Sequence, residues 1–233
     1  MAAQIDPCDF LALVLPFLKE GQAAELAEAV QVRWKTGQVA RLIEDQNTDV
    51  RRVAAVVLGL VGDLDCIPNL TSALHDSDSQ VNRMAEHSLW AIWFKASKPE
   101  AIRPFNRGVS LLNEEDYAQA ITKFDQSIQF DTNFAEAYNQ TAIAHFFLGQ
   151  WPSAIEACEQ AIGMIPVHFG AIACLGHCQM QAGNLDKALE CYRQALLINP
   201  CMPGIGVAIT QIEEQVRRDK AASGTFLSLD VVI

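Results

Sequence analysis

The sequence predicts an all-α protein, built as a right-handed superhelix of stacked helix pairs. Two internal periods support this prediction: a period of 34 residues runs through the C-terminal half, and one of 31 runs through the N-terminal half. Composition agrees, because half of the residues are hydrophobic while only 8% are aromatic. Periods of this length are typical of helical solenoids, in which each unit buries its apolar face against its neighbour.

The 34-residue period is defined by small residues that let two helices approach closely. They are Ala120, Ala154 and Ala188, followed four places later by the larger Phe124, Cys158 and Tyr192. Pro166 and Pro200 end two of the units, and Gly149 and Gly183 allow the chain to reverse within a unit. This pattern resembles the tetratricopeptide repeat. The resemblance implies three helix pairs over residues 98–203, with the first helix of each pair lining a concave groove.

The N-terminal period is clearest in residues 49–62, DVRRVAAVVLGLVG. Four residues of this stretch recur 31 places later, as the pairs Val50/Val81, Arg52/Arg83, Ala54/Ala85 and Leu58/Leu89. This stretch resembles the short bacterial HEAT repeat, in which Asp and Arg form a ladder between successive units. Asp49 and Arg51 or Arg52 fit that pattern, but Gln80 stands where the next Asp belongs, so we expect an incomplete ladder. The resemblance implies HEAT-like units over residues 1–97. The short polar link at residues 95–100 favours one continuous superhelix over two tethered modules.

Two further segments follow the last repeat. Ile205, Ile209, Ile212 and Val216 fall at helical spacing and predict an amphipathic capping helix over residues 204–222. We expect the helix to end at residues 221–224 and to leave an apolar tail at residues 223–233. Two alternatives remain open for this tail. Either it is unstructured, or it docks on its own helices or on a second copy, which would make the protein a homo-oligomer.

Charge and cysteine usage narrow the partners and the compartment. The net charge is −11 without any basic block, so we expect no nucleic-acid or membrane partner. The seven cysteines fall mostly within predicted helices, which indicates free thiols in a reducing cytoplasm. Asp6 and Asp9 precede the first apolar run and no Lys or Arg does, unlike a secretory signal. We therefore expect a cytoplasmic protein.

We find no catalytic motif and predict a protein without enzymatic activity or cofactor. Residues 76–80 begin like a calcium loop, but Val81 and His87 stand where that loop needs Gly and Glu. We interpret these residues as caps of the following helix.

One group of residues, around Cys174 and Cys178, has side chains of the kinds that bind metal ions. Cys174 and Cys178 share a helix face beside His177, and we expect Cys191 and Cys201 to be the only other thiols nearby. A structural zinc ion needs four ligands. We interpret these cysteines as core thiols and predict no metal site.

The groove is the predicted binding site for a partner protein. Its expected lining residues are Phe105, Val109, Asn113, Asn139, Ile143, Phe146, His177, Met180 and Gln181. Pro104 indicates that the first helix of this region starts late. Tetratricopeptide proteins are known for a clamp of Lys, Arg and Asn that grips the C-terminal carboxylate of a chaperone. At the matching positions this chain has Phe105, Val109, Gly170 and Cys174.

We therefore predict a scaffold or adaptor that binds an apolar peptide or amphipathic helix instead of a chaperone tail. Two other functions are alternatives to the adaptor. One is a structural protein that self-associates through its C-terminal tail. The other is an enzyme that attaches bilins to phycobiliprotein cysteines, because short HEAT units also occur there; the change to a second repeat type argues against it.

Overall fold

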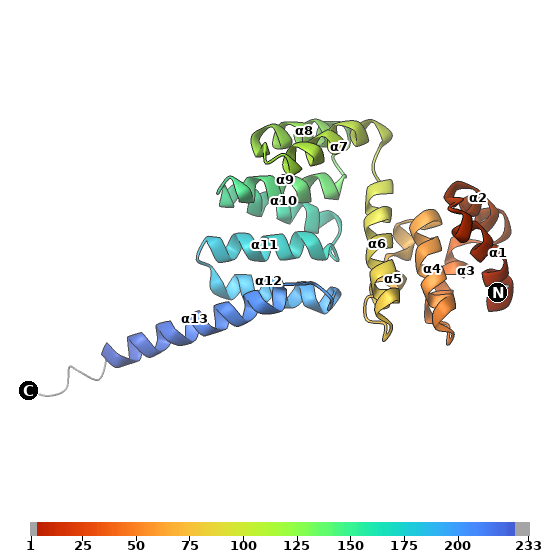
Figure 1. Cartoon of the computed structure of the whole chain (residues 1–233). Coiled ribbons are helices and arrows are strands. Elements are labelled where there is room, and N and C mark those ends of the chain that lie inside the picture. Colours follow the sequence, from red (N-terminus) through yellow and green to blue (C-terminus); the bar gives the residue numbers. More distant parts are fainter. Residues whose placement is uncertain (1–3, 227–233) are drawn as a thin grey trace, which may run out of the picture.

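The computed structural model describes residues 4–226, and within that range every regular element is a helix (Figure 1). The first stack comprises α1 (Pro7–Glu20), α2 (Ala23–Arg33), α3 (Thr36–Ala40), the 3-10 turn Arg41–Glu44, α4 (Thr48–Val61), the 3-10 turn Leu64–Cys66, α5 (Ile67–Ala73) and α6 (Ser79–Lys95). The second comprises α7 (Pro99–Asn113), α8 (Tyr117–Phe130), α9 (Ala135–Phe147), α10 (Trp151–Met164), α11 (Phe169–Gln181), α12 (Leu185–Ile198) and α13 (Ile205–Phe226). The predicted all-α repeat superhelix is confirmed. None of the described helices combines the length and hydrophobicity needed to cross a bilayer.

The first stack is joined by a double ion pair between α4 and the turn before α6. Arg51 holds Asp76 with Nε–Oδ2 and Nη2–Oδ1 distances of 2.6 and 3.0 Å, and Arg52 holds Asp78 at 3.0 and 2.6 Å. Two Arg–Asp pairs therefore connect these two units. Turn residues supply the carboxylates in place of Gln80. Asp78 also caps α6, as predicted, by accepting two backbone N–H bonds.

In the second stack, small residues on the first helix of each pair face larger ones on the second. The facing positions are Gly108 and Phe124, Ala142 and Cys158, and Gly176 and Tyr192. A Cβ atom at Gly108 would lie 2.5 Å from the Phe124 ring, and one at Gly176 would lie 2.6 Å from Tyr192. Glycine is required there because the ring fills the space. The middle pair differs, because the small thiol of Cys158 leaves room for the methyl group of Ala142 on the facing helix.

The turns inside the three pairs share one left-handed residue. Glu115, Gly149 and Gly183 lie 34 residues apart and have φ values of 61°, 71° and 80°. Gly149 and Gly183 therefore reverse the chain as predicted, while the first pair tolerates a strained Glu at that position. The late start predicted for α7 was wrong, because the helix begins at Pro99 and carries Pro104 in its interior.

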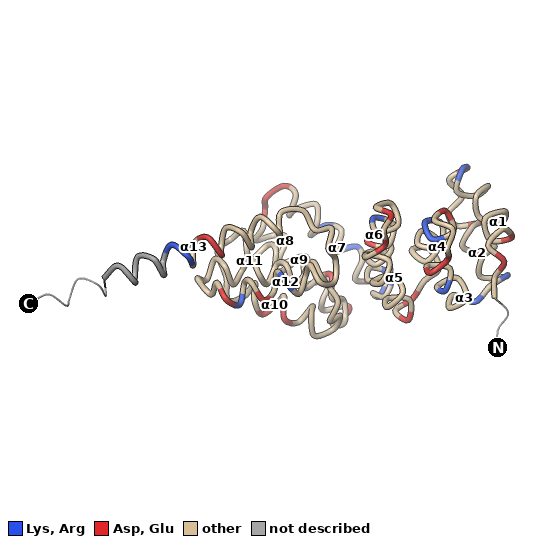
Figure 2. The backbone as a smooth tube through the Cα atoms, turned by 90° about the horizontal axis from the view of Figure 1, so that it is seen from below, with Lys and Arg blue, Asp and Glu red and all other residues tan. Residues whose placement is uncertain are grey.

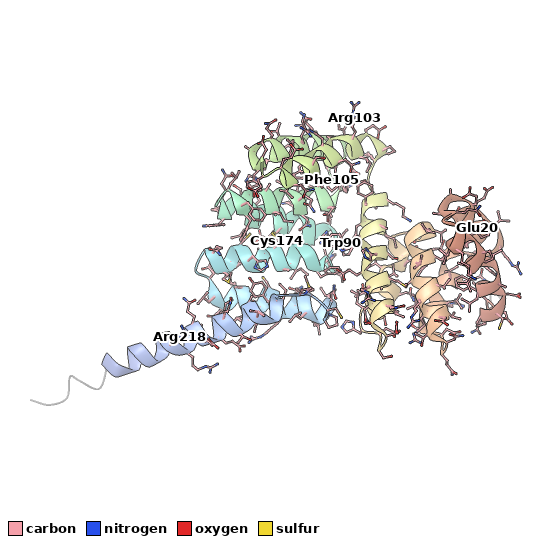
Figure 3. All side chains as sticks on the ribbon, in the orientation of Figure 1. Glu20, Trp90, Arg103, Phe105, Cys174 and Arg218 are labelled. Atoms are coloured by element: carbon pink, nitrogen blue, oxygen red, sulfur yellow. The ribbon has the colours of Figure 1, made fainter. Side chains whose placement is uncertain are left out.

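The two stacks meet along α6, which runs across the ends of the second-stack helices (Figures 1 and 3). Trp93 stacks on His168, with ring centroids 4.4 Å apart and an interplanar angle of 17°. His168 Nδ1 accepts the backbone N–H of Ala171, so its proton is on Nε2, which donates to Glu136 at 3.1 Å. His168 and Trp93 are buried, as is the Glu136 carboxylate. We call these three residues the junction.

Further contacts extend the junction on both sides. Trp90, labelled in Figure 3, packs edge-on against Phe169 with ring centroids 5.5 Å apart. His75 at the end of α5 lies 3.0 Å from the carbonyl of Leu197 in α12. The short link between α6 and α7 was expected to keep the stacks together, and these contacts show how they are held.

The capping helix forms where it was predicted, with Ile205 and Ile212 buried against α12. Its end was misplaced, because α13 continues through residues 221–224 to Phe226. Most of the predicted apolar tail, residues 227–233, lies outside the described residues. All seven cysteines are free thiols, as expected. Figure 2 shows acidic and basic residues dispersed along the backbone of both stacks.

The Arg51–Asp76 pair predicts acid-sensitive stability. Hydrogen bonding to Arg51 lowers the pKa of Asp76, so the pair contributes above the usual carboxyl pKa and is lost as the pH falls through the lowered value. The two side chains are only 13% and 10% exposed. Asp76→Asn should cost about 1–3 kcal/mol at pH 7, with a smaller difference in acid, measured by urea unfolding. Asp49→Asn, at a carboxylate that is 71% exposed, should change stability by less than about 0.5 kcal/mol. Equal effects of the two changes would contradict the prediction.

The left-handed turn residues predict opposite effects at matched positions. Glu115→Gly should stabilise the chain by about 1 kcal/mol, because glycine relieves the backbone strain at φ 61°. Gly149→Ala should destabilise by a similar amount, since the added Cβ meets Trp151 only at an ordinary 3.7 Å and the cost comes from φ alone. Both values come from chemical denaturation. A loss of stability in Glu115→Gly would refute the strain at this turn.

Candidate functional site

A pocket of about 480 Å³ opens between α9, α11 and the start of α13, and α6 closes one side of it. Its lining residues are Glu86, Ile143, Phe146, Phe147, Gly170, Ala173, Cys174, His177, Met202, Pro203 and Ile205. Cys174, labelled in Figure 3, marks its position on α11. Most of these side chains are apolar, so the pocket favours apolar groups.

Helical geometry brings the α11 residues to one face. Ala173 and Cys174 follow Gly170 by three and four residues, and His177 follows them by four and three, which places all four on one side of the helix. Phe146 of α9 faces them, with its ring centroid 6.2 Å from that of His177. The two facing helices therefore form the floor and one wall.

The rest of the aromatic surface comes from the α9–α10 turn. The Phe146 ring lies 5.8 Å from Phe147 and 5.4 Å from Trp151, measured between centroids. Phe147 is exposed and stacks on Tyr117, with centroids 5.0 Å apart. Phe146 is therefore half-buried at the mouth of the pocket, and the Phe147 and Trp151 rings hold it in position.

Two polar residues belong to the lining. Burial lowers the pKa of His177, so its ring is neutral near pH 7, and Nδ1 lies 2.7 Å from the Tyr192 hydroxyl. Glu86 of α6 is then the one ionised side chain among the lining residues. The pocket consequently carries a single negative charge on an otherwise apolar surface.

The predicted groove residues divide into two groups. Ile143, Phe146 and His177 line the pocket. Phe105 does not, because it is buried in an aromatic cluster with Phe94, Phe124 and Phe134, and its assignment to the groove was wrong. Asn139 is also buried, and its amide donates to Glu136 at 3.3 Å instead of facing a ligand. Val109, Asn113, Met180 and Gln181 lie outside the pocket lining, and of these Asn113 and Gln181 are exposed.

Sequence reasoning missed the lining residues that come from outside the groove helices. Met202, Pro203 and Ile205 belong to the segment that leads into α13, and Glu86 belongs to the other stack. None of them occupies a position in the 34-residue repeat, so the repeat pattern gives no signal for them. Only the packing of α6 and α13 on the second stack brings them to the site.

Trp90 of α6 also limits the size of the side chain at position 170, which lines the pocket. A Cβ atom at Gly170 would lie 2.8 Å from the Trp90 ring. The position therefore holds no side chain while Trp90 stays in place. This is one of the positions at which a chaperone clamp would carry Lys.

Family models for both repeat types match parts of this chain. The HEAT repeats family model matches residues 38–117, and the tetratricopeptide repeat model matches residues 171–200. Hsp70-Hsp90 organizing protein 1 of Glycine max is 28% identical over 120 residues, covering 52% of this chain and 21% of that protein. Small glutamine-rich tetratricopeptide repeat-containing protein 2 of Mycosarcoma maydis is 24% identical over 116 residues, covering 50% and 33%. The chain thus spans no more than a third of these relatives.

Solved structures show the same fold for the second stack. The Sgt2 tetratricopeptide domain from Aspergillus fumigatus superposes with a TM-score of 0.52 at 17% identity, covering 54% of this chain and 84% of that one. The first such domain of RPAP3 (Spaghetti), bound to the HSP90 peptide SRMEEVD, gives 0.50 at 18% identity, covering 51% and 94%. Together with the repeat positions and the helix pairs, these matches show that the chain carries HEAT repeats at residues 38–117 and a tetratricopeptide repeat at residues 171–200.

Proposed function

We propose that this protein is a non-enzymatic adaptor that binds an apolar peptide segment in the pocket between α9, α11 and α13. The observation that carries the proposal is the pocket itself, whose volume of about 480 Å³ is lined mainly by apolar side chains. Pockets of this size suit a few anchoring side chains of a peptide. The relatives named above, which include an organizing protein for two chaperones, support a role in protein interaction.

Glu86 supports a preference among such peptides. Its carboxylate is the one acidic group among the lining residues and favours a Lys or Arg next to the apolar anchors. The same charge disfavours acidic segments, and the net charge of −11 adds to that repulsion. We therefore assign the site to apolar peptides that carry positive charge.

This assignment differs from the peptide seen with RPAP3. SRMEEVD is acidic and ends in a carboxylate, which needs cationic partners. Here Phe105 is part of the core, and Trp90 occupies the space beside Gly170. Cys174 stands where the clamp would carry Arg. None of the pocket-lining residues supplies a positive charge in place of the missing cationic clamp residues.

The surroundings of His177 favour binding over catalysis. Its ring is paired with the Tyr192 hydroxyl and not with a carboxylate that would orient it as a general base. The bilin-attachment alternative is not favoured by any contact in the pocket, and one of the relatives named above is a tetratricopeptide repeat-containing protein. Self-association through residues 227–233 concerns a segment outside the described residues.

Replacing one pocket aromatic tests the proposal. Peptides selected from a random heptapeptide library on the purified chain should contain two or more apolar residues and a Lys or Arg. Phe146→Glu should weaken their binding at least tenfold, about 1.4 kcal/mol, because it places a charge among apolar groups. Phe130→Glu is the matched control, at a ring that is 53% exposed on α8 and outside this pocket. Fluorescence anisotropy measures affinity, and circular dichroism checks that both variants stay folded.

The HSP90 peptide SRMEEVD provides the opposing probe. It should neither bind nor displace the selected peptides, because the lining offers it no cation. Displacement by SRMEEVD, or selected peptides that bind the folded Phe146→Glu variant as tightly as the unmodified chain, would contradict the assignment of the pocket.

A further inference from the structure

A cluster of three thiols lies beside the pocket, in the middle of the second stack. Cys158 of α10 and Cys174 and Cys178 of α11 are all buried, and their Sγ atoms lie within 4.8 Å of one another. The sequence had suggested Cys191 and Cys201 as the thiols closest to Cys174. That interpretation was wrong, because the facing helix contributes Cys158, 16 residues earlier in the chain.

The repeat frame explains why the three sulfur atoms meet. Cys158 occupies the position at which the other two pairs carry Phe124 and Tyr192. A thiol is much smaller than an aromatic ring, so space is left between α10 and α11. Cys174 and Cys178, one helical turn apart, project into that space. The convergence thus comes from an irregularity in the repeat.

The composition of the cluster selects a particular class of ion. Three sulfur atoms form a soft ligand set, which favours Cu(I) over hard cations such as Mg²⁺ or Ca²⁺. Among the described residues the cluster contains three ligands, one fewer than structural zinc takes. His177 is adjacent in sequence, but Nδ1 faces the Tyr192 hydroxyl at 2.7 Å. Three-coordinate binding matches what the residues offer.

The cluster is accessible from the pocket. Cys174 is 8% exposed and lines the pocket, which gives an entry path to the three sulfur atoms.

We propose that Cys158, Cys174 and Cys178 form a binding site for a three-coordinate, thiol-seeking cation, with Cu(I) as the ion that fits best. On binding, each S–H bond is replaced by an S–Cu bond and its proton passes to solvent. Copper enters and stays as Cu(I), so the step involves no oxidation or reduction. The site does not depend on the peptide-binding role proposed above.

A competition experiment tests the site on the full chain. Cu(I) held by the coloured chelator bicinchoninate is titrated anaerobically with the protein, and we expect one Cu(I) to be withdrawn per chain. Cys158→Ala should reduce the apparent affinity at least tenfold. The double variant Cys191→Ala/Cys201→Ala is the matched control, because neither thiol belongs to the cluster, and its affinity should be unchanged.

The unmodified protein supplies a second measurement that does not depend on any variant folding correctly. X-ray absorption at the copper edge should give three sulfur neighbours around each ion. The proposal is overturned if the chain withdraws no Cu(I), if copper has nitrogen or oxygen neighbours, or if binding survives in Cys158→Ala. It is equally overturned if binding is lost in the control, since that would place the ion at the other thiols.

Discussion

The stacking of Trp93 on His168 fixes the rest of the arrangement, because it is where the two repeat types become one body. The ring pair is buried, and His168 is held in turn by Glu136 and by the Ala171 amide. An unpaired buried polar group costs free energy, so the His168–Glu136 hydrogen bond holds the start of α11 against α9, and the stacked Trp93 ring places α6 beside them. The pocket depends on this contact, because α6 carries both the lining residue Glu86 and the Trp90 ring that fills the space beside Gly170.

Local features of the fold were predictable from sequence, and the features that depend on contact between distant segments were not. The 34-residue period gave the helix pairs and the left-handed turns at Gly149 and Gly183, because both depend on nearby residues. Nothing in either period identified Trp93 and His168 as partners. Helical spacing placed Phe105 in the groove, although α7 turns that face toward Phe94 and Phe134. A single period cannot distinguish the inner face of a pair from its outer face.

The pocket and the thiol cluster share one structural origin. The middle pair combines Ala142 with Cys158, while its neighbours combine glycine with an aromatic ring. The volume that this exchange frees is filled by Cys174 and Cys178, and Cys174 then forms part of the pocket surface. Packing density alone would be satisfied by other small apolar side chains. The choice of three thiols at one point adds soft-ligand chemistry to a surface that otherwise recognises apolar groups.

The junction holds the two stacks in one fixed arrangement. Cys8 on α1 and Cys201 before α13 are both exposed, so each stack carries a native thiol for a spin label once the half-buried Cys191 is replaced by serine. Double electron–electron resonance between these labels should give one narrow distance distribution, which broadens in Trp93→Ala. A broad distribution in the protein with Trp93 intact would contradict the claim.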